Sequence, residues 1–305
     1  MPLVHRIDTL LKSGTFPMEG GFLILFWMVN FLPYRRTNEA DSTRGHLNHD
    51  TVDYIVQKLP RVVKDALHAL VLAKLFTEPE SISDMLRSSI QQVDDSLTSR
   101  VLSLLSENMN ENARASADDI PSEFPDADML LIAQSFGGAT LVLSLTDLRG
   151  NLWIANLGAL GDTWLKIPAS YASHMYKNAK PPWISPTQFD DYALRILTPP
   201  YVSNISDVHY LTPQVPYFLL LGSDGLLSTE RYNEMNATQV LEHWVSILGS
   251  AIDSKTETNV NAALRLLRDI LGGDDVDMVS RNLTVEMDER WVDDITLLVQ
   301  TVRIG

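Results

Sequence analysis

Two apolar segments of the sequence meet acidic residues at their ends. The segment "FLLLGSD" ends at Asp224, and the segment "DDITLLVQ" begins with Asp293 and Asp294. If the two segments are neighbouring antiparallel strands, the end of one lies beside the start of the other, so Asp224 and Asp293 share one rim of a sheet. Two partly desolvated carboxylates repel each other unless a cation or a proton lies between them, so the pattern indicates a metal site. The alternative is an Asp-Gly turn, with solvated charges at the strand ends.

The composition narrows the chemistry of such a site. The 305 residues include no cysteine, which excludes disulfides, thiolate catalysis and cysteine-based zinc sites. Oxygen ligands without cysteine or a histidine pair favour Mg²⁺ or Mn²⁺ over zinc. The formal net charge of −15 disfavours nucleic acid or an anionic membrane as the main partner, because basic surfaces bind both. The apolar stretch at 20–36 is too short for a spanning helix, and we interpret it as a buried strand or packing segment.

The periodicity of apolar residues predicts an α+β fold. Helical spacing predicts helices over 50–75 and 81–105, with Pro60 dividing or kinking the first and Ser81 or Ser83 capping the second. The other expected elements are an exposed loop at 106–129, a β-hairpin at 138–158, a strand at 163–167, irregular chain at 168–216, a buried strand at 216–224, helices at 237–252 and 259–273, and a closing strand at 293–304. This order lacks the helix–strand alternation of a parallel sheet, so it predicts antiparallel sheets in one domain.

Several motifs in a fixed order carry a resemblance to a known family. They are "GGAT" (137–140), "LWIANLGALGD" (152–162), "LLLGSDG" (219–225), "LGGDDVDMVSRNLT" (271–284) and "WVDDITLLVQ" (291–300). In this order the chain resembles the metal-dependent Ser/Thr protein phosphatases (the PPM or type 2C family), and the branch it looks most like is that of the fungal pyruvate dehydrogenase phosphatase-like members. The similarity covers about residues 45–303.

The resemblance implies a fold and an activity. The fold is a four-layer sandwich of two antiparallel β-sheets flanked by helices on both faces, here over 41–305, with 1–40 as an atypical N-terminal segment. The activity is hydrolysis of phosphoserine and phosphothreonine in a phosphoprotein substrate. Two Mg²⁺ or Mn²⁺ ions activate a water for in-line attack, so no phosphoenzyme is needed. The implied compartment is intracellular, cytoplasmic or mitochondrial; the oligomeric state stays open.

The site residues follow from the same motifs. Asp224 and Asp293 match metal-binding aspartates of the family, and Gly45 lies in the metal-binding motif. His46 matches the residue placed to protonate the leaving group; the alternative is an exposed loop histidine. Asp162 is a possible third-metal or auxiliary ligand, and so is the second acidic residue of the closing pair, Asp294.

The sequence also departs from the family. Arg44 stands where the family has the aspartate that bridges both metals, and a guanidinium has no lone pair to offer a cation. Segment 34–41 lies too close to Gly45 to supply the usual upstream ligands. Asp162 fits only if three residues are inserted, and otherwise Ala159 takes its place. Near the position of a further acidic residue the chain has Ser228.

These departures leave three interpretations open. The first is an active or weakened phosphatase. The second is a catalytically dead pseudophosphatase that keeps the fold as a binding or scaffold module. The third is that residues 1–44 do not represent the native start, because the change to family-like sequence at Gly45 is abrupt.

Overall fold

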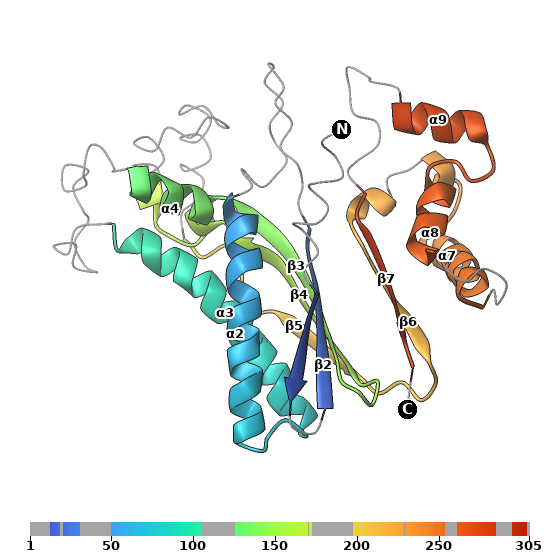
Figure 1. Ribbon diagram of the computed structural model, residues 1–305. Coiled ribbons are helices and arrows are strands. Elements are labelled where there is room, and N and C mark those ends of the chain that lie inside the picture. Colours follow the sequence, from blue (N-terminus) through green and yellow to red (C-terminus); the bar gives the residue numbers. More distant parts are fainter. Residues whose placement is uncertain are drawn as a thin grey trace. The chain divides into compact units, whose positions relative to one another are not determined.

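The computed structural model describes residues 13–18, 21–30, 50–104, 126–169, 171–172, 198–227, 230–253, 261–284 and 295–303. For 13–18, 21–30 and 126–129, and for Asp224 and Glu230, the description is of the backbone alone. The chain divides into two compact units, residues 1–213 (with residue 305) and residues 214–304. Figure 1 shows their elements.

The first unit contains a five-stranded antiparallel sheet in the order β1-β2-β3-β4-β5. Its strands are β1 (Ser13–Met18), β2 (Gly21–Asn30), β3 (Gly138–Thr146), β4 (Leu152–Gly161) and β5 (Asp207–Leu211). The hairpin between β3 and β4 closes on Asp147, whose Oδ1 accepts the backbone N–H groups of Arg149 and Asn151, both at 2.9 Å. Such an Asx turn satisfies the backbone locally. The hairpin expected at 138–158 is confirmed.

Three helices pack on this sheet. They are α2 (Asp50–Leu72), α3 (Pro79–Leu102) and α4 (Asp126–Phe136). Helices α2 and α3 lie against one face of the sheet (Figure 1), with apolar residues at helical spacing turned inward. The shared core includes Ile55, Leu59, Leu86, Ile90, Leu141 and Leu143, each at most 1% exposed. Burying one such side chain contributes about 1.5–3 kcal/mol, and this packing holds the helices to the sheet.

The ends and interiors of two helices differ from expectation. Pro60 lies inside α2 and does not divide it, because the packing of the buried residues on both sides compensates for one missing helical hydrogen bond. Helix α3 begins at Pro79, with Glu78 as its N-cap residue, so neither Ser81 nor Ser83 is the cap. The fixed φ of proline suits the first helical position. The Ser83 hydroxyl instead donates to the Pro79 carbonyl at 3.1 Å.

The second unit pairs two strands and packs helices on them. Strands β6 (Tyr217–Gly222) and β7 (Leu297–Val302) are antiparallel, and each has one neighbouring strand within the described part of this unit. The helices are α7 (Ala237–Asp253), α8 (Ala262–Ile270) and α9 (Val276–Thr284). Side chains from α7, α8 and the strands form its core, which includes Leu226, Val240, Trp244, Leu248, Leu266 and Ile270. The strands and helices expected here are confirmed, and α9 is an addition.

Residues 13–30 belong to the sheet of the first unit, and the expectation that 1–40 is an atypical N-terminal segment for the family stays a prediction. Strand β1 pairs with β2, and β2 pairs with β3 from Ile24 opposite Thr146 to Asn30 opposite Thr140. The apolar stretch is thus a strand, as expected. Its partner β3 is more than a hundred residues away, so no local pattern could identify it.

Three further expectations need correction. Residues 163–167 do not form a strand, because the chain leaves β4 at Asp162 in a left-handed conformation and turns into the 3-10 helix η2 (Thr163–Leu165). The stretch 168–216 is not irregular throughout, since it contains β5. The segment 106–129 overlaps the start of α4, and residues 105–125 lie outside the described residues.

The fold class is α+β with antiparallel sheets, as the sequence predicts. The stacking of the two sheets into a four-layer sandwich stays a prediction. No helix in the described ranges is both long enough and apolar enough to span a membrane.

Candidate functional site

The junction between β6 and β7 is closed by a pair of hydrogen bonds beyond the last ladder pair. Gly222 lies opposite Leu297 in the register. The Ser223 backbone N–H then donates to the Thr296 carbonyl at 3.0 Å, and the Thr296 backbone N–H donates to the Ser223 hydroxyl at 2.9 Å. The β6 and β7 segments therefore stay side by side up to Ser223 and Thr296, at the end of the sheet.

At this end of the sheet the chain turns sharply, and a glycine, Gly222, leaves the space that the turn needs. A Cβ on Gly222 would collide with the Leu226 side chain, so glycine makes room for that leucine. The Leu226 backbone N–H donates to the Ser223 carbonyl at 3.1 Å and closes a 3-10 turn, η3 (Asp224–Leu226). Asp224 is thus the first residue of a tight turn directly after β6.

The antiparallel neighbourhood on which the predicted metal site depends is confirmed. The backbone of Asp224 leaves the sheet at the end where β7 begins. Asp293 and Asp294 precede Ile295 in the sequence, and they lie outside the described residues, as does the side chain of Asp224. The separation of the carboxyl groups stays a prediction.

Asp162 follows β4 at the rim where β3 begins. Gly138 lies opposite Gly161, and the Asp162 backbone N–H donates to the Gly137 carbonyl at 2.8 Å. Asp162 has φ 46° and is 8% exposed. A left-handed conformation is uncommon for a residue other than glycine, although aspartate tolerates it better than most.

Strand β4 contains a β-bulge near Ala159, and it ends at Gly161, directly before Asp162. In the register, Ala139 faces Leu160 and Leu141 faces Leu157, so two residues of β4 face one of β3. The bulge absorbs one extra residue inside the strand. Ala159 therefore lies within β4, and Asp162 is the first residue after it.

The first turn of α2 packs against this same rim. A Cβ on Gly161 would meet the Gly137 carbonyl oxygen and lie 2.9 Å from the Thr51 side chain. Thr51 itself is fully buried. Gly45 and His46 precede Asp50, the first residue of α2, by five and four residues. Arg44, Gly45 and His46 lie outside the described residues, as does Ser228.

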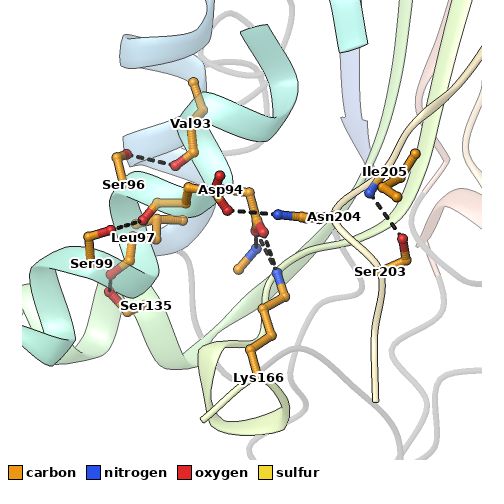
Figure 2. Close-up of polar contacts among 12 residues, drawn as sticks. Val93, Asp94, Ser96, Leu97, Ser99, Ser135, Lys166, Ser203, Asn204 and Ile205 are labelled. Carbon is orange, nitrogen blue, oxygen red and sulfur yellow. Dashed lines mark hydrogen bonds and ion pairs between the residues drawn. The ribbon is translucent and has the colours of Figure 1, made fainter. Parts of the chain in front are cut away.

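A buried ion pair, which the sequence analysis did not identify, lies beside Asp162. Lys166 donates from Nζ to both carboxylate oxygens of Asp94, at 2.6 Å each (Figure 2). The Gly161 backbone N–H donates to Asp94 Oδ1 at 2.8 Å. The two side chains are 8% and 1% exposed. Burial raises the pKa of Asp94, and Lys166 and Gly161 offset part of that rise. The signal in the sequence is a single charged residue among the buried positions of α3.

A second polar cluster in the other unit also escaped the sequence analysis. Asp269 of α8 accepts hydrogen bonds from Arg231 Nη2 at 2.6 Å and from the Tyr232 hydroxyl at 3.1 Å, and its Oδ2 lies 2.8 Å from His243 Nε2. Burial acts to raise the pKa of Asp269, but hydrogen bonds from Arg231 and His243 outweigh it and hold that pKa below its ordinary value. Burial also raises the pKa of Tyr232. The cluster ties α8 to α7 and to the chain between β6 and α7.

Among the residues that the structure describes, no group of three or more His, Cys, Asp or Glu side chains is arranged to hold a metal ion. A comparison with models of known protein families matched none of them, and a comparison with curated proteins found no significant match.

Proposed function

We propose that the chain is a metal-dependent phosphoserine and phosphothreonine protein phosphatase, weakened by Arg44. The observation that carries the proposal is the antiparallel pairing of β6 and β7. It brings the backbone of Asp224 to the end of the sheet at which the chain enters β7. Asp293 lies two residues before Ile295, and two residues of chain span at most about 7 Å.

The residues at this junction fit a hard divalent cation. Aspartate supplies carboxylate oxygens, which Mg²⁺ and Mn²⁺ prefer, and the chain has no thiolate to favour zinc. Asp224 and Asp293 would hold the cation, with Gly45 as a third contact. Asp162, and the other aspartate of the closing pair, Asp294, would serve as auxiliary ligands.

The chemistry of the reaction divides between the cations and the chain. When bound, Mg²⁺ or Mn²⁺ lowers the pKa of a water and orients it for in-line attack on phosphorus. The aspartates hold and partly neutralise the cations. The new P–O bond forms to the water oxygen as the ester P–O bond breaks, and His46 gives a proton to the leaving serine or threonine oxygen. No side chain needs to form a covalent intermediate.

Arg44 is the reason to expect weak activity. Replacing a bridging carboxylate with a guanidinium changes the local charge by two units and removes the oxygen ligand. Asp224 and Asp293 can still attract one divalent ion, because two close carboxylates gain by neutralisation. A second ion would face a positive charge, so we expect it to bind far more weakly. The same argument supports the second candidate, a pseudophosphatase that binds partners without turnover.

Hydrolysis of a phosphothreonine peptide by the full chain tests the proposal. We expect slow phosphate release that requires Mn²⁺, stops with a chelator and is abolished by Asp224→Asn. The matched control is Asp253→Asn, which makes the same change of charge at an exposed residue at the end of α7 and should leave the rate unchanged. Binding of Mn²⁺ without turnover would favour the pseudophosphatase. If Asp224→Asn and Asp253→Asn hydrolyse the peptide equally well, both candidates lose their metal site.

A further inference from the structure

We propose that the outer edge of β5 is a docking surface for a second copy of this chain, whose own β5 pairs with it antiparallel across a two-fold axis. The inference goes beyond the proposed function and does not depend on it. Strand β5 is the last strand of the five-stranded sheet, and β4 is its one neighbouring strand in the described part of the chain. A sheet edge without a partner strand is a template for pairing with another chain.

Exposure alternates strictly along residues 205–211. Every second residue, beginning with the first, is exposed, and the three between them are buried or half-buried. Val208 and Tyr210 pack against the core that α2 and α3 share with the sheet, which fixes one face of the segment. The strand carries neither proline nor lysine, two of the residues that commonly block pairing at an exposed edge. The opposite face presents an exposed row of four side chains: Ile205, Asp207, His209 and Leu211.

The chain that leads into β5 is held by hydrogen bonds, so Ile205 keeps its place in the exposed row. The Ile205 N–H donates to the Ser203 hydroxyl at 3.1 Å (Figure 2). The Asn204 side-chain amide donates to Asp95 Oδ1 of α3 at 2.7 Å. Ile205 is 70% exposed and Leu211 is 48% exposed. Two large apolar side chains therefore stand in solvent at the ends of the exposed row, with a carboxylate and an imidazole between them.

The order of side chains in the exposed row is complementary to itself. In an antiparallel pair centred on Val208, each residue faces the residue equally far from the centre on the other strand. Asp207 of each copy then faces His209 of the other, and Ile205 of each copy faces Leu211 of the other. An imidazole has an N–H to donate to a carboxylate in either of its protonation states. Carboxylate thus meets imidazole, and apolar side chain meets apolar side chain, at all four positions.

This complementarity makes a second copy the preferred occupant of the edge. A strand from an unrelated protein could bond to the same backbone groups, but it would have to supply the same apolar, imidazole, carboxylate, apolar order. A pair centred on His209 is a poorer alternative, because it would set Asp207 against Leu211 and one imidazole against the other. Opposite charges and apolar pairs directly across two strands stabilise a sheet, whereas like charges destabilise it.

The mass of the full chain in solution tests the proposal, measured by sedimentation equilibrium near neutral pH. Seven paired residues make a small interface, so we expect a weak dimer with a dissociation constant of roughly 10–100 µM. The mean mass should rise from that of the 34.1 kDa monomer toward twice that value as the protein concentration increases through this range. A wild-type chain that stays monomeric throughout overturns the proposal.

Exchanging the two polar groups of the exposed row tests the register. His209→Asp sets two carboxylates against each other at two positions, so we expect the dissociation constant to rise at least about tenfold. Asp207→His combined with His209→Asp keeps each carboxylate opposite an imidazole, and this double variant should associate within about threefold of the wild type. The control is His68→Asp, the same substitution at an exposed position on α2, which should leave association unchanged. A double variant that associates no better than His209→Asp overturns the proposal, as does equal association of His209→Asp and His68→Asp.

A second pair of variants covers the case in which His209→Asp fails to fold. Ile205→Lys changes a side chain that is 70% exposed, and it sets an ammonium group against Leu211 of the other copy. We expect it to weaken association about tenfold. Adding Leu211→Glu should restore association, because the two introduced charges face each other across the axis. Urea unfolding verifies that each variant is folded, and folded Ile205→Lys that associates like the wild type overturns the proposal.

Discussion

Ser223 and Thr296 exchange two hydrogen bonds that join β6 to β7 just before Asp224. One runs between backbone groups at 3.0 Å, and the other runs from the Thr296 N–H to the Ser223 hydroxyl at 2.9 Å. The hydroxyl thus extends the sheet by one step, at the residue where the β6 backbone turns away. If Asp224 and Asp293 hold a cation as proposed, we expect this extension to set the spacing between them.

Substituting Ser223 with alanine should therefore loosen the junction. Ser223→Ala removes one acceptor from a partly buried N–H, so we expect the free energy of unfolding to fall by about 1 kcal/mol in urea titrations. Mn²⁺ affinity should fall as well, as measured by calorimetry. Ser203→Ala is the control, since the Ser203 hydroxyl also accepts a backbone N–H, that of Ile205 at 3.1 Å, but in an exposed loop. Equal Mn²⁺ affinities in the two variants would contradict the role given to Ser223.

Gly161 and Gly158 form a natural pair for testing the rim at Asp162. A Cβ at Gly161 meets the Gly137 carbonyl and the Thr51 side chain, and its φ is 85°, whereas a Cβ at Gly158 has nothing within 4 Å. Gly161→Ala should lower the free energy of unfolding by at least about 1–2 kcal/mol, the cost of a left-handed alanine. Gly158→Ala should be close to neutral. Urea denaturation measures both, and a neutral Gly161→Ala would mean that α2 does not pack closely on this rim.

The free energy of unfolding should depend on pH through Asp269. The pKa of Asp269 is lower in the folded chain than the ordinary 3.8, so its stabilisation is present above that value and is lost as the pH falls through the folded pKa. Near neutral pH, Asp269→Asn should cost about 1–3 kcal/mol, because Arg231, Tyr232 and His243 lose a charged acceptor.

The measurement is urea unfolding at pH 6 and at pH 3 or below. The difference between wild type and Asp269→Asn should shrink at the lower pH, where the carboxyl group becomes protonated. Asp277→Asn, at an exposed position in the first turn of α9, is the control and should show a much smaller difference. A difference that grows on acidification would show that the sign of the Asp269 pKa shift is wrong.

Arg44→Asp should restore activity if Arg44 lies at the metal site. Each 1.36 kcal/mol of recovered transition-state stabilisation raises the rate about tenfold, so we expect Mn²⁺-dependent hydrolysis of a phosphopeptide to rise by orders of magnitude. Arg61→Asp makes the same change of charge at an exposed position on α2 and should not raise it. If the wild-type chain already turns over at a rate that Arg44→Asp does not improve, Arg44 is not at the metal site.

The sequence predicted those elements of the fold whose pattern lies within a short stretch of residues. Helices α2, α3, α7 and α8 show their 3.6-residue spacing, and the Arg-Gly turn marks the β3–β4 hairpin. The sheet partners of β2 and β5 could not be predicted, because pairing joins distant segments and leaves no local signal. The prediction of an extra strand after β4 was wrong, because a single residue, Asp162, turns the backbone out of the sheet.

The features of the candidate site also differ in whether the local sequence could predict them. The two apolar segments that form β6 and β7 could be identified from the sequence, and their antiparallel pairing was the condition on which the predicted metal site depended. The Asp94–Lys166 pair could not be predicted, since its members are separated by 72 residues and meet only through the packing of α3 on the sheet. The charge of Asp94 among Ile90, Val93 and Leu97 indicates that it has a buried partner, but the sequence does not identify that partner.

The pairing of β6 with β7 also has a consequence for handling the protein. Neither six-residue strand contains a proline or a charged residue, which are the devices that commonly keep exposed strand edges from pairing with other molecules. Short apolar segments of this kind assemble readily once they are released from a fold. Heating that opens the second unit should therefore end in precipitation, visible as light scattering, and refolding yields should fall as protein concentration rises.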